Sequence, residues 1–350
     1  MSKILLVVQT LSKGGAERVV SNLSKEFERI GHEVKIVLFN DIVCYEYGGE
    51  IVNLNLPASK NYLIKFFRLF QRITRLKKIF NQENPDFIFS FMESANFPCI
   101  LTGKKVFVSV RCNPNLFFSI FQKILVKFLY NFNNVMVIPC SKGIELILNN
   151  EYGVKNTKTM LNPVIFDNCC EIKEDLSRYK PFILAVGRLD WSKNFEMLIR
   201  AFSKTRTSHE AKLIILGDGQ KQEELRALIS KLNLNEKVLL LGNRDNIRDY
   251  YLQSKIFVLS SKTEGFPNVL IEALSNNCAC IATDCPTGPN EIIQNNFNGI
   301  LVENKNEETM TKAIDELYFN EELIVKFKSN AAKSIEYLSV ENIAKKWLTL

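Results

Sequence analysis

The sequence contains very little of what builds metal centres in proteins. Its only histidines are His32 and His209, and its nine cysteines form no Cys-x-x-Cys pair. Zinc sites draw on clusters of these two residue types, so no zinc site is expected. We expect reduced thiols, most of them buried.

Long apolar runs are also missing. The first run, residues 4–8, is too short for the core of a signal peptide, and no apolar run without Lys or Arg reaches transmembrane length. The sequence therefore predicts a cytoplasmic protein with no membrane span. Its 350 residues are 46% hydrophobic and 24% charged, without a low-complexity tract, which is typical of a globular protein of two domains.

Short apolar segments alternate with helical ones along the chain. The strand-like segments are 4–8, 33–39, 86–91, 105–110 and 135–139, followed by 182–187, 212–217, 237–242, 256–260 and 278–283. Apolar strands that alternate with helices are typical of parallel sheets covered on both faces. The sequence therefore predicts an α/β protein with two doubly wound, Rossmann-like domains facing a central cleft.

The less regular interval 162–181 separates the two series and is typical of a linker. We expect the first domain at residues 1–165 and the second at 166–335. A C-terminal helix at 336–350 is expected to pack back on the first domain. Ligands of such sheets bind beyond the carboxyl ends of the strands, so the loops that follow the strands should carry the functional site.

The loop after residues 256–260 places two glutamates around a helix start. It continues as KTEGFPNVLIEAL, with Glu264 before Gly-Phe-Pro and Glu272 eight residues later. Pro267 favours the first helical position, and the free N–H groups of a helix start attract anions. Carboxylates accept hydrogen bonds from hydroxyls. The pattern fits a nucleotide sugar, although both glutamates also suit ordinary surface positions.

Four other loops that follow strands carry glycines and polar residues. They are GGAER at 14–18, GRLDWSKN at 187–194, GDG at 217–219 and GNR at 242–244. In this order and spacing, and together with EGFPNVLIEAL, they resemble the family 4 glycosyltransferases of the two-lobed GT-B type. The resemblance covers essentially the whole chain. It implies a retaining hexosyltransferase that uses a nucleotide-sugar donor.

The resemblance assigns the donor site to the second domain. Glu264 would face the hydroxyls of the donor sugar, and Glu272 would face those of the ribose. Arg188 and Lys193 would supply cations to the diphosphate, whose charge grows in the transition state. Arg188, Lys193 and Glu264 are therefore the expected catalytic residues. No Asp-x-Asp sequence occurs, so we expect metal-independent activity without a cofactor.

Further donor contacts are expected from glycines, turns and the helix start. They are Gly14, Gly15, Gly217, Asn243, Arg244, Asn268, Val269 and Leu270. The last three would offer backbone N–H groups to phosphate. Gly14 and Gly15 would let the backbone approach the diphosphate or the acceptor. The other three suit a nucleoside pocket as well as ordinary turns, and they do not separate uracil from guanine.

One departure from the family pattern lies in the loop after residues 105–110. Many members have a histidine there, whereas this chain continues as Arg111-Cys112-Asn113-Pro114. Arg111 cannot act as a base at neutral pH, but it suits a phosphate or a sugar hydroxyl. Glu93 is the one nearby carboxylate that stays a candidate. Both are expected to contact the acceptor or the sugar.

Residues 61–82 combine basic and aromatic side chains at helical spacing. The basic residues are Lys65, Arg68, Arg72, Arg75, Lys77 and Lys78, and no acidic residue occurs before Glu83. A basic amphipathic helix suits an anionic membrane surface, although a helix that faces the core with a basic outer face has the same pattern. The aromatic-rich segment 116–132 favours the membrane. We expect peripheral association with its inner face.

Together these patterns predict transfer of a hexosyl or N-acetylhexosaminyl group from a nucleotide sugar, with UDP as the expected nucleotide. The expected acceptor is a membrane-associated glycan or a lipid-linked glycan in the biosynthesis of a cell-surface polysaccharide, such as capsule or lipopolysaccharide. One alternative is a non-catalytic sugar-binding or scaffold protein of a polysaccharide assembly complex. Another is a GDP-mannose-dependent mannosyltransferase. No nucleic-acid partner is expected.

Overall fold

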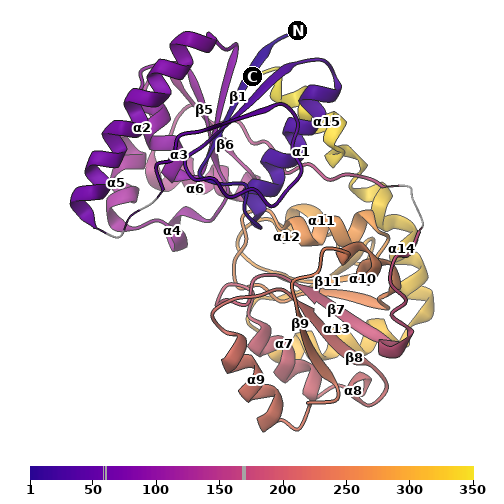
Figure 1. Cartoon of the computed structure of the whole chain (residues 1–350). Coiled ribbons are helices and arrows are strands. Elements are labelled where there is room, and N and C mark those ends of the chain that lie inside the picture. The colour runs from indigo at the N-terminus through magenta and orange to yellow at the C-terminus, as the bar shows by residue number, and fades with distance from the viewer. Residues whose placement is uncertain (58, 60, 168–170) are drawn as a thin grey trace. The chain divides into compact units, whose positions relative to one another are not determined.

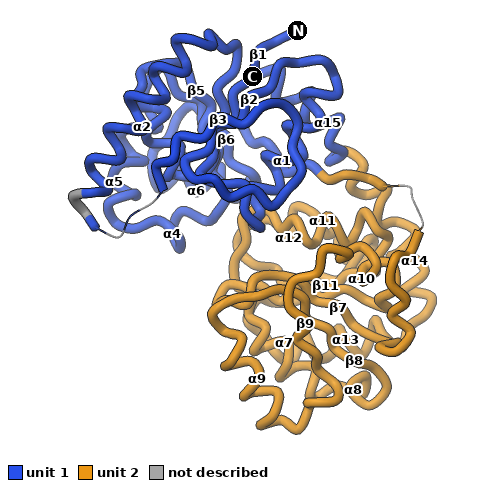
Figure 2. Tube along the Cα trace, viewed as in Figure 1, with its two compact units in different colours: residues 1–163, 338–350 blue, residues 164–337 orange. Residues whose placement is uncertain are grey.

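The computed structural model describes residues 1–57, 59, 61–167 and 171–350 (Figure 1). The expected linker 162–181 therefore includes three residues, 168–170, that lie outside the described ones. The chain forms two compact units (Figure 2). Unit 1 consists of residues 1–163 and 338–350, and unit 2 consists of residues 164–337. These limits lie close to those expected from the sequence.

Unit 1 is built around a six-stranded sheet with the order β3-β2-β1-β4-β5-β6. Its strands are β1 (Lys3–Val8), β2 (Glu33–Leu38), β3 (Glu50–Asn53), β4 (Phe87–Phe91), β5 (Val106–Val110) and β6 (Val135–Pro139). All neighbouring strands are parallel. The chain order reverses between β1 and β4, which are neighbours in the sheet. Strand β3 was not expected, because four residues at a sheet edge give too short an apolar pattern.

Helices cover both faces of this sheet. They are α1 (Gly15–Arg29), α2 (Tyr62–Glu83), α3 (Glu93–Ile100), α4 (Pro114–Phe117), α5 (Ile120–Leu129), α6 (Lys142–Tyr152) and α15 (Val340–Trp347). The segment 116–132 is divided between α4 and α5. Ser119 caps α5 in a capping box with Gln122, and this cap starts a new helix in the middle of the apolar run.

The C-terminal helix belongs to unit 1. Helix α15 packs against α1, and Trp347 on α15 is completely buried. Its ring centroid lies 4.9 Å from that of Phe89 and 5.6 Å from that of Phe91. Both phenylalanines belong to β4, so the last helix of the chain completes the core over the centre of the first sheet.

Unit 2 repeats the same topology with the order β12-β11-β10-β7-β8-β9. Its strands are β7 (Phe182–Val186), β8 (Lys212–Leu216), β9 (Val238–Gly242), β10 (Ile256–Leu259), β11 (Cys280–Asp284) and β12 (Gly299–Glu303). All pairs are parallel. The chain order reverses between β7 and β10. The edge strand β12 was not expected from the sequence.

The helices of unit 2 follow the strands in alternation. They are α7 (Phe195–Ser203), α8 (Thr207–Glu210), α9 (Gln222–Lys231), α10 (Ile247–Gln253), α11 (Asn268–Ser275), α12 (Pro289–Ile292), α13 (Glu307–Phe319) and α14 (Glu321–Ser334). Short 3-10 helices occupy Ser177–Tyr179 and Glu336–Leu338. Among the described helices of either unit, none combines the length and the apolarity needed to span a membrane.

Candidate active site

The strongest candidate site lies where the chain order of the second sheet reverses. In parallel sheets the crevice at this position is the usual ligand site. Strands β7 and β10 are neighbours there, and the loops that follow them carry Lys193 and Glu264. The two expected catalytic residues thus come from segments far apart in sequence and meet because the strands are adjacent.

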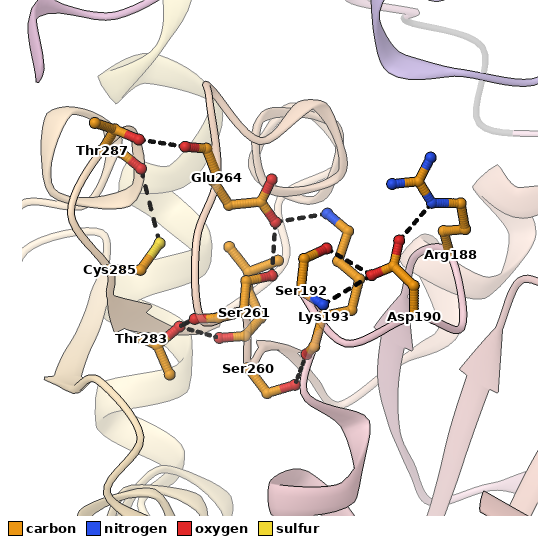
Figure 3. A network of polar contacts seen from close by, with 11 residues as sticks. Arg188, Asp190, Ser192, Lys193, Ser260, Ser261, Glu264, Thr283, Cys285 and Thr287 are labelled. Atoms are coloured by element: carbon orange, nitrogen blue, oxygen red, sulfur yellow. Dashed lines mark hydrogen bonds and ion pairs between the residues drawn. The ribbon is translucent and has the colours of Figure 1, made fainter. Parts of the chain in front are cut away.

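Lys193 and Glu264 form an ion pair (Figure 3). The Nζ atom of Lys193 lies 2.5 Å from Oε1 of Glu264, and their side chains are 16% and 10% exposed. The hydroxyl of Ser261 donates to the same Oε1 atom at 2.6 Å. Both donors use one carboxylate oxygen, so Oε2 takes part in neither bond. Ser261 was missed by sequence analysis, because a serine before a glutamate has no distinguishing pattern.

Arg188 lies beside this pair but in a different environment. Its side chain is 69% exposed, and its Nε atom lies 2.5 Å from Oδ2 of Asp190. Burial opposes ionisation of Asp190, but hydrogen bonds from Ser192 and Arg188 outweigh it and lower the pKa of this carboxyl. Asp190 therefore stays ionised and holds the β7 loop in shape. Arg188 is exposed to solvent and well placed to meet an anion.

Gly217 has a packing role that the sequence did not reveal. Its φ angle is +134°, and a Cβ atom at this position would lie 2.0 Å from the carbonyl oxygen of Gly187. The backbone N–H of Leu189 donates to the carbonyl of Asp218 at 2.9 Å. Gly217 is thus required for the close approach of the β7 and β8 loops, which shapes the segment that carries Arg188.

Helix α11 begins at Asn268, and Pro267 is its N-cap rather than its first residue. The backbone N–H of Leu270 donates to the carbonyl of Pro267 at 3.1 Å. The expectation that Leu270 offers a free N–H group to phosphate is therefore wrong, because the first helical turn already uses it. Asn268 and Val269 lie half-buried in that turn and keep the positions expected for them.

Glu272 lies on α11, about one turn after the helix start. The hydroxyl of Tyr251 lies 3.4 Å from its Oε2 atom and 3.3 Å from the carbonyl oxygen of Val269. Tyr251 is buried and comes from α10, so it links the two helices at this position. It is a site residue that sequence analysis missed, because a tyrosine on an apolar helix resembles any core residue.

Asn243 and Arg244 follow β9 and are exposed. Strand β9 lies at the sheet edge, two strands away from β7. The N–H of Gly217 donates to the carbonyl of Gly242 at 2.9 Å, which joins the β8 and β9 loops. The three loops after β7, β8 and β9 therefore form one connected rim, with Asn243 and Arg244 at its outer end.

Glu93 lies where the chain order of the first sheet reverses, at the start of α3. It is 5% exposed, and burial raises its pKa to about 7. The Tyr130 hydroxyl lies 3.4 Å from its Oε1 atom. Asn96 donates to the Tyr130 oxygen at 3.0 Å, and Ser90 donates to Asn96 at 2.7 Å. Because the Tyr130 oxygen accepts the bond from Asn96, the Tyr130 hydroxyl donates its own proton toward Glu93.

Arg111 follows β5 and lies over two stacked aromatic rings. Its guanidinium carbon lies 5.4 Å from the ring centroids of both Phe91 and Trp347, and it donates a hydrogen bond to Asn162. Burial lowers its pKa to about 10, so it stays charged at neutral pH and is no base. Arg111 connects β5 to the C-terminal helix, and its direct contact with a ligand stays a prediction.

Gly14 and Gly15 lie at the start of α1. Gly14 is the N-cap with φ −142°, an extended conformation that any residue adopts. A Cβ atom there would meet only the flexible carboxylate of Glu17. Neither strain nor tight backbone packing therefore requires glycine at position 14, and the expected approach of a ligand to Gly14 and Gly15 stays a prediction.

The arginines of α2 are engaged within unit 1. Arg68 donates to the carbonyl of Pro57, Arg72 to that of Leu56 at 2.7 Å and Arg75 to that of Leu54 at 2.5 Å. Burial and the neighbouring Arg68 lower the pKa of Arg72 to about 10. All three arginines thus have backbone partners, although Arg75 is exposed, and the role of this basic face at a membrane stays a prediction. They fasten the segment that follows β3 to α2.

Comparison with known proteins places both halves of the chain in glycosyltransferase families. Residues 171–334 match the family model for glycosyl transferases group 1, and residues 13–164 match that for glycosyltransferase family 4. A relative from Campylobacter jejuni is 33% identical over 99% of this chain and 100% of its own length. It is the N-acetylgalactosamine-N,N'-diacetylbacillosaminyl-diphospho-undecaprenol 4-alpha-N-acetylgalactosaminyltransferase. The amylovoran biosynthesis glycosyltransferase AmsD of Erwinia amylovora is 28% identical over 99% of each chain.

Solved structures show the same fold. The chain matches Anabaena Alr3699/HepE, crystallised with UDP-glucose, with a TM-score of 0.82, 18% identity and full coverage of both chains. It matches TarM with a TM-score of 0.83, 18% identity and coverage of 100% of this chain and 98% of the other. At this identity the likeness concerns the fold. The expected GT-B class, with two Rossmann-like parallel sheets, is confirmed.

Proposed function

The chain belongs to the glycosyltransferases of group 1 and family 4, and we propose that it transfers a hexosyl or N-acetylhexosaminyl group from a UDP-sugar to a lipid-linked glycan. The observation that carries this proposal is the Lys193–Glu264 pair at the reversal point of the second sheet. The pair combines a cation for phosphate with a carboxylate for sugar hydroxyls in one half-buried position.

In the proposed reaction the diphosphate of the donor lies near Arg188, Lys193 and the start of α11. Arg188 is exposed and charged, and it neutralises the oxygen atoms that gain charge as the bond to the sugar breaks. Glu264 binds a hydroxyl of the donor sugar through the oxygen that Lys193 and Ser261 leave free. Glu272, supported by Tyr251, binds the ribose. Asn268 and Val269 offer backbone N–H groups to phosphate.

We propose transfer with retention and without a metal ion. The bond between the anomeric carbon and the diphosphate oxygen breaks, and a bond from the acceptor oxygen to the same face of that carbon forms. The acceptor proton passes to the departing diphosphate. This route requires no enzymic base on the acceptor, which suits a chain with Arg111 where many relatives have histidine.

The acceptor is proposed to be a glycan on a lipid diphosphate. The Campylobacter relative is named for a diphospho-undecaprenol acceptor and an N-acetylgalactosaminyl donor group, and AmsD is named for amylovoran biosynthesis. These names support a surface-polysaccharide step and an N-acetylhexosamine donor. We assign acceptor binding to unit 1, with Glu93 as its candidate contact.

We also propose that unit 1 attaches to the inner face of the membrane, through apolar side chains rather than through the arginines of α2. Exposed apolar side chains gather on α2, α4 and α5: Ile64, Phe66, Phe67, Phe70, Leu116, Phe117, Ile120, Phe121, Ile124 and Phe128. Both α2 and α5 pack on α3, and Figure 1 shows them along the same side of the unit. We call this set the apolar surface of unit 1. Exposed aromatic patches of this kind suit a lipid interface.

The test of the proposed function is a donor panel. The protein is incubated with UDP-glucose, UDP-galactose, their N-acetylamino forms and GDP-mannose, and slow release of nucleotide is measured with and without a lipid-diphosphate acceptor. We expect one UDP-N-acetylhexosamine to be hydrolysed and the acceptor to accelerate turnover. Glu264→Ala is the inactive control. Turnover of GDP-mannose alone would support the mannosyltransferase, and no turnover would support the scaffold protein.

A further inference from the structure

Four buried hydroxyl groups from the loops and ends of β10 and β11 lie around the Lys193–Glu264 pair (Figure 3). They belong to Ser260, Ser261, Thr283 and Thr287, all of which are buried. Ser260 and Ser261 follow β10, and Thr283 and Thr287 lie at or after the end of β11. These strands are neighbours in the sheet. The hydrogen bond that each hydroxyl makes shows which part of the site it holds.

Three of these hydroxyls hold backbone atoms in place. Ser260 donates to the carbonyl of Lys193 at 2.8 Å, and Thr287 donates to the carbonyl of Glu264. Thr283 donates to the carbonyl of Ser261 at 2.6 Å. The backbone positions of the lysine, the glutamate and the serine are therefore fixed from the two neighbouring strands. Only the hydroxyl of Ser261 contacts a charged side-chain atom.

The bond from Ser261 selects one oxygen of the Glu264 carboxylate. A lysine ammonium is a compact charge on a flexible chain and contacts either oxygen of a carboxylate equally well. The ion pair alone therefore leaves the carboxylate free to rotate. With Ser261 also donating to Oε1 at 2.6 Å, both donors act on one atom and the rotation is fixed. Oε2 is then the oxygen left for a ligand.

We propose that Ser261 is a positioning residue for sugar transfer, which orients Glu264 so that its Oε2 atom receives a hydroxyl of the donor sugar. The proposal rests on the proposed function, because it assumes that Glu264 faces the sugar. It assigns to Ser261 a role in recognising the sugar and none in binding the nucleotide. The serine reaches the donor only through Glu264.

This role predicts that Ser261 affects the affinity for a UDP-sugar and not the affinity for UDP. A buried hydroxyl that only fills a hydrogen-bonding position would, on removal, lower the stability of unit 2 and affect every ligand equally. A hydroxyl that orients Glu264 would affect only ligands that carry a sugar. The ratio between the affinity for a UDP-sugar and the affinity for UDP therefore separates the two roles, since UDP has no group for Glu264.

The experiment compares the wild type, Ser261→Ala and Ser208→Ala by calorimetry with UDP and with UDP-N-acetylgalactosamine. Ser208 is a matched control, because it is a buried serine of unit 2 that donates to a carbonyl, that of Thr205, at 2.7 Å. Loss of one hydrogen bond to a charged group corresponds to about a tenfold change. We call the ratio between the affinity for the UDP-sugar and the affinity for UDP the sugar-dependent affinity. We expect this ratio to be about tenfold lower in S261A, with its UDP affinity within about twofold of the wild type. S208A should keep both.

A double-mutant cycle with Glu264→Gln tests whether Ser261 acts through the glutamate. In the E264Q background, S261A should cause no further loss of sugar-dependent affinity, because the oriented group is already changed. Additive losses would overturn the proposal. If S261A fails to fold, Thr283→Val takes its place, since it removes the bond that fixes the Ser261 backbone and should cause a smaller loss in the same direction.

The outcomes separate the two proposals. A wild type that binds neither UDP nor the UDP-sugar, and no other nucleotide sugar of the panel, overturns the proposed function and this inference with it. A wild type that binds the UDP-sugar more tightly than UDP, with S261A retaining the full difference, overturns the role of Ser261 alone.

Discussion

The Nζ atom of Lys193 lies 2.5 Å from Oε1 of Glu264 while both side chains are largely buried. Arg188, the other cation of the site, is 69% exposed and paired with Asp190 in its own loop. Removing one or the other cation therefore leaves its carboxylate partner in a different state. Removing Lys193 leaves a largely buried carboxylate without its cation, whereas removing Arg188 leaves Asp190 bonded to Ser192.

The first prediction follows from this difference. Arg188→Ala and Lys193→Ala should each lower turnover by roughly 10²–10³-fold, because each removes a fixed cation near the departing diphosphate. Only Lys193→Ala should also destabilise unit 2, by about 3–5 kcal/mol, since it breaks a buried pair from one side. Denaturant unfolding and donor turnover of both variants check this. Equal stability of the two variants would contradict the assigned geometry.

The second prediction concerns the two glutamates. Glu272→Gln should weaken UDP binding about tenfold, because ribose contacts are similar in the ground and transition states. Glu264→Gln should leave UDP affinity nearly unchanged and lower turnover. Calorimetry with UDP and steady-state kinetics separate the two effects. Tyr251→Phe should weaken UDP binding less than Glu272→Gln does. An equal loss of UDP affinity in both glutamate variants would refute the division of roles.

The third prediction concerns Glu93, whose pKa burial raises to about 7 from an ordinary 4.5. Between these values the folded protein holds a proton that the unfolded chain has released, so stability falls as pH rises through this window. The contribution is fully present below about pH 4.5 and lost above about pH 7. Glu93→Gln should therefore be more stable than the wild type at about pH 8, by about 3 kcal/mol.

The same pair of proteins should have nearly equal stability well below pH 4.5, because Glu93 is then neutral in both the folded and the unfolded state. Urea unfolding of the wild type and of Glu93→Gln across this range measures the difference. Parallel stability profiles at every pH would show that the pKa of Glu93 is the same in the folded and the unfolded protein, which would contradict the effect of its burial.

The fourth prediction concerns membrane attachment. Replacing Ile120, Phe121 and Phe128 with serine should release the protein from vesicles of mixed anionic lipids, because these exposed side chains of α5 would supply apolar insertion. UDP affinity should be unchanged. Sedimentation with vesicles measures the bound fraction. A triple variant that sediments like the wild type would remove the apolar surface of unit 1 as the attachment site.

Matched charge variants complete that experiment. Lys77 and Lys78 are exposed on α2, and their replacement with glutamate should weaken attachment moderately and mainly at low salt. Replacing Arg72 is not a fair test of membrane charge, because its guanidinium bonds to the Leu56 carbonyl and lies 4.2 Å from the ring of Phe39. Its loss should instead destabilise unit 1.

Much of the fold was accessible from the sequence because buried parallel strands produce near-continuous apolar runs. The positions of Lys193 and Glu264 were accessible for the same reason, since strand ends locate loops. The edge strands β3 and β12 were missed, being short and less apolar than the central ones. The sequence also did not reveal that the N–H group of Leu270 is used within α11, because this depends on where the first helical turn closes.

Partners brought together by the fold were beyond the sequence. Tyr130 reaches Glu93 from the end of α5, one strand further along the chain, and Tyr251 reaches Glu272 from the preceding βα unit. The arginines of α2 also make contacts that the sequence did not reveal. A basic face was recognised correctly as a pattern, but backbone carbonyls of the segment after β3 were available to pair with it, and periodicity carries no information about them.

The position of α15 has a consequence for synthesis of the chain on the ribosome. Unit 2 is continuous in sequence, whereas unit 1 is completed only by residues 338–350. The first sheet therefore leaves the ribosome long before Trp347 is available to cover Phe89 and Phe91, and the second unit is complete before the first. Until the last helix docks, the nascent first unit exposes aromatic residues of its central strand, and chaperones that bind exposed apolar segments would meet the chain at that position.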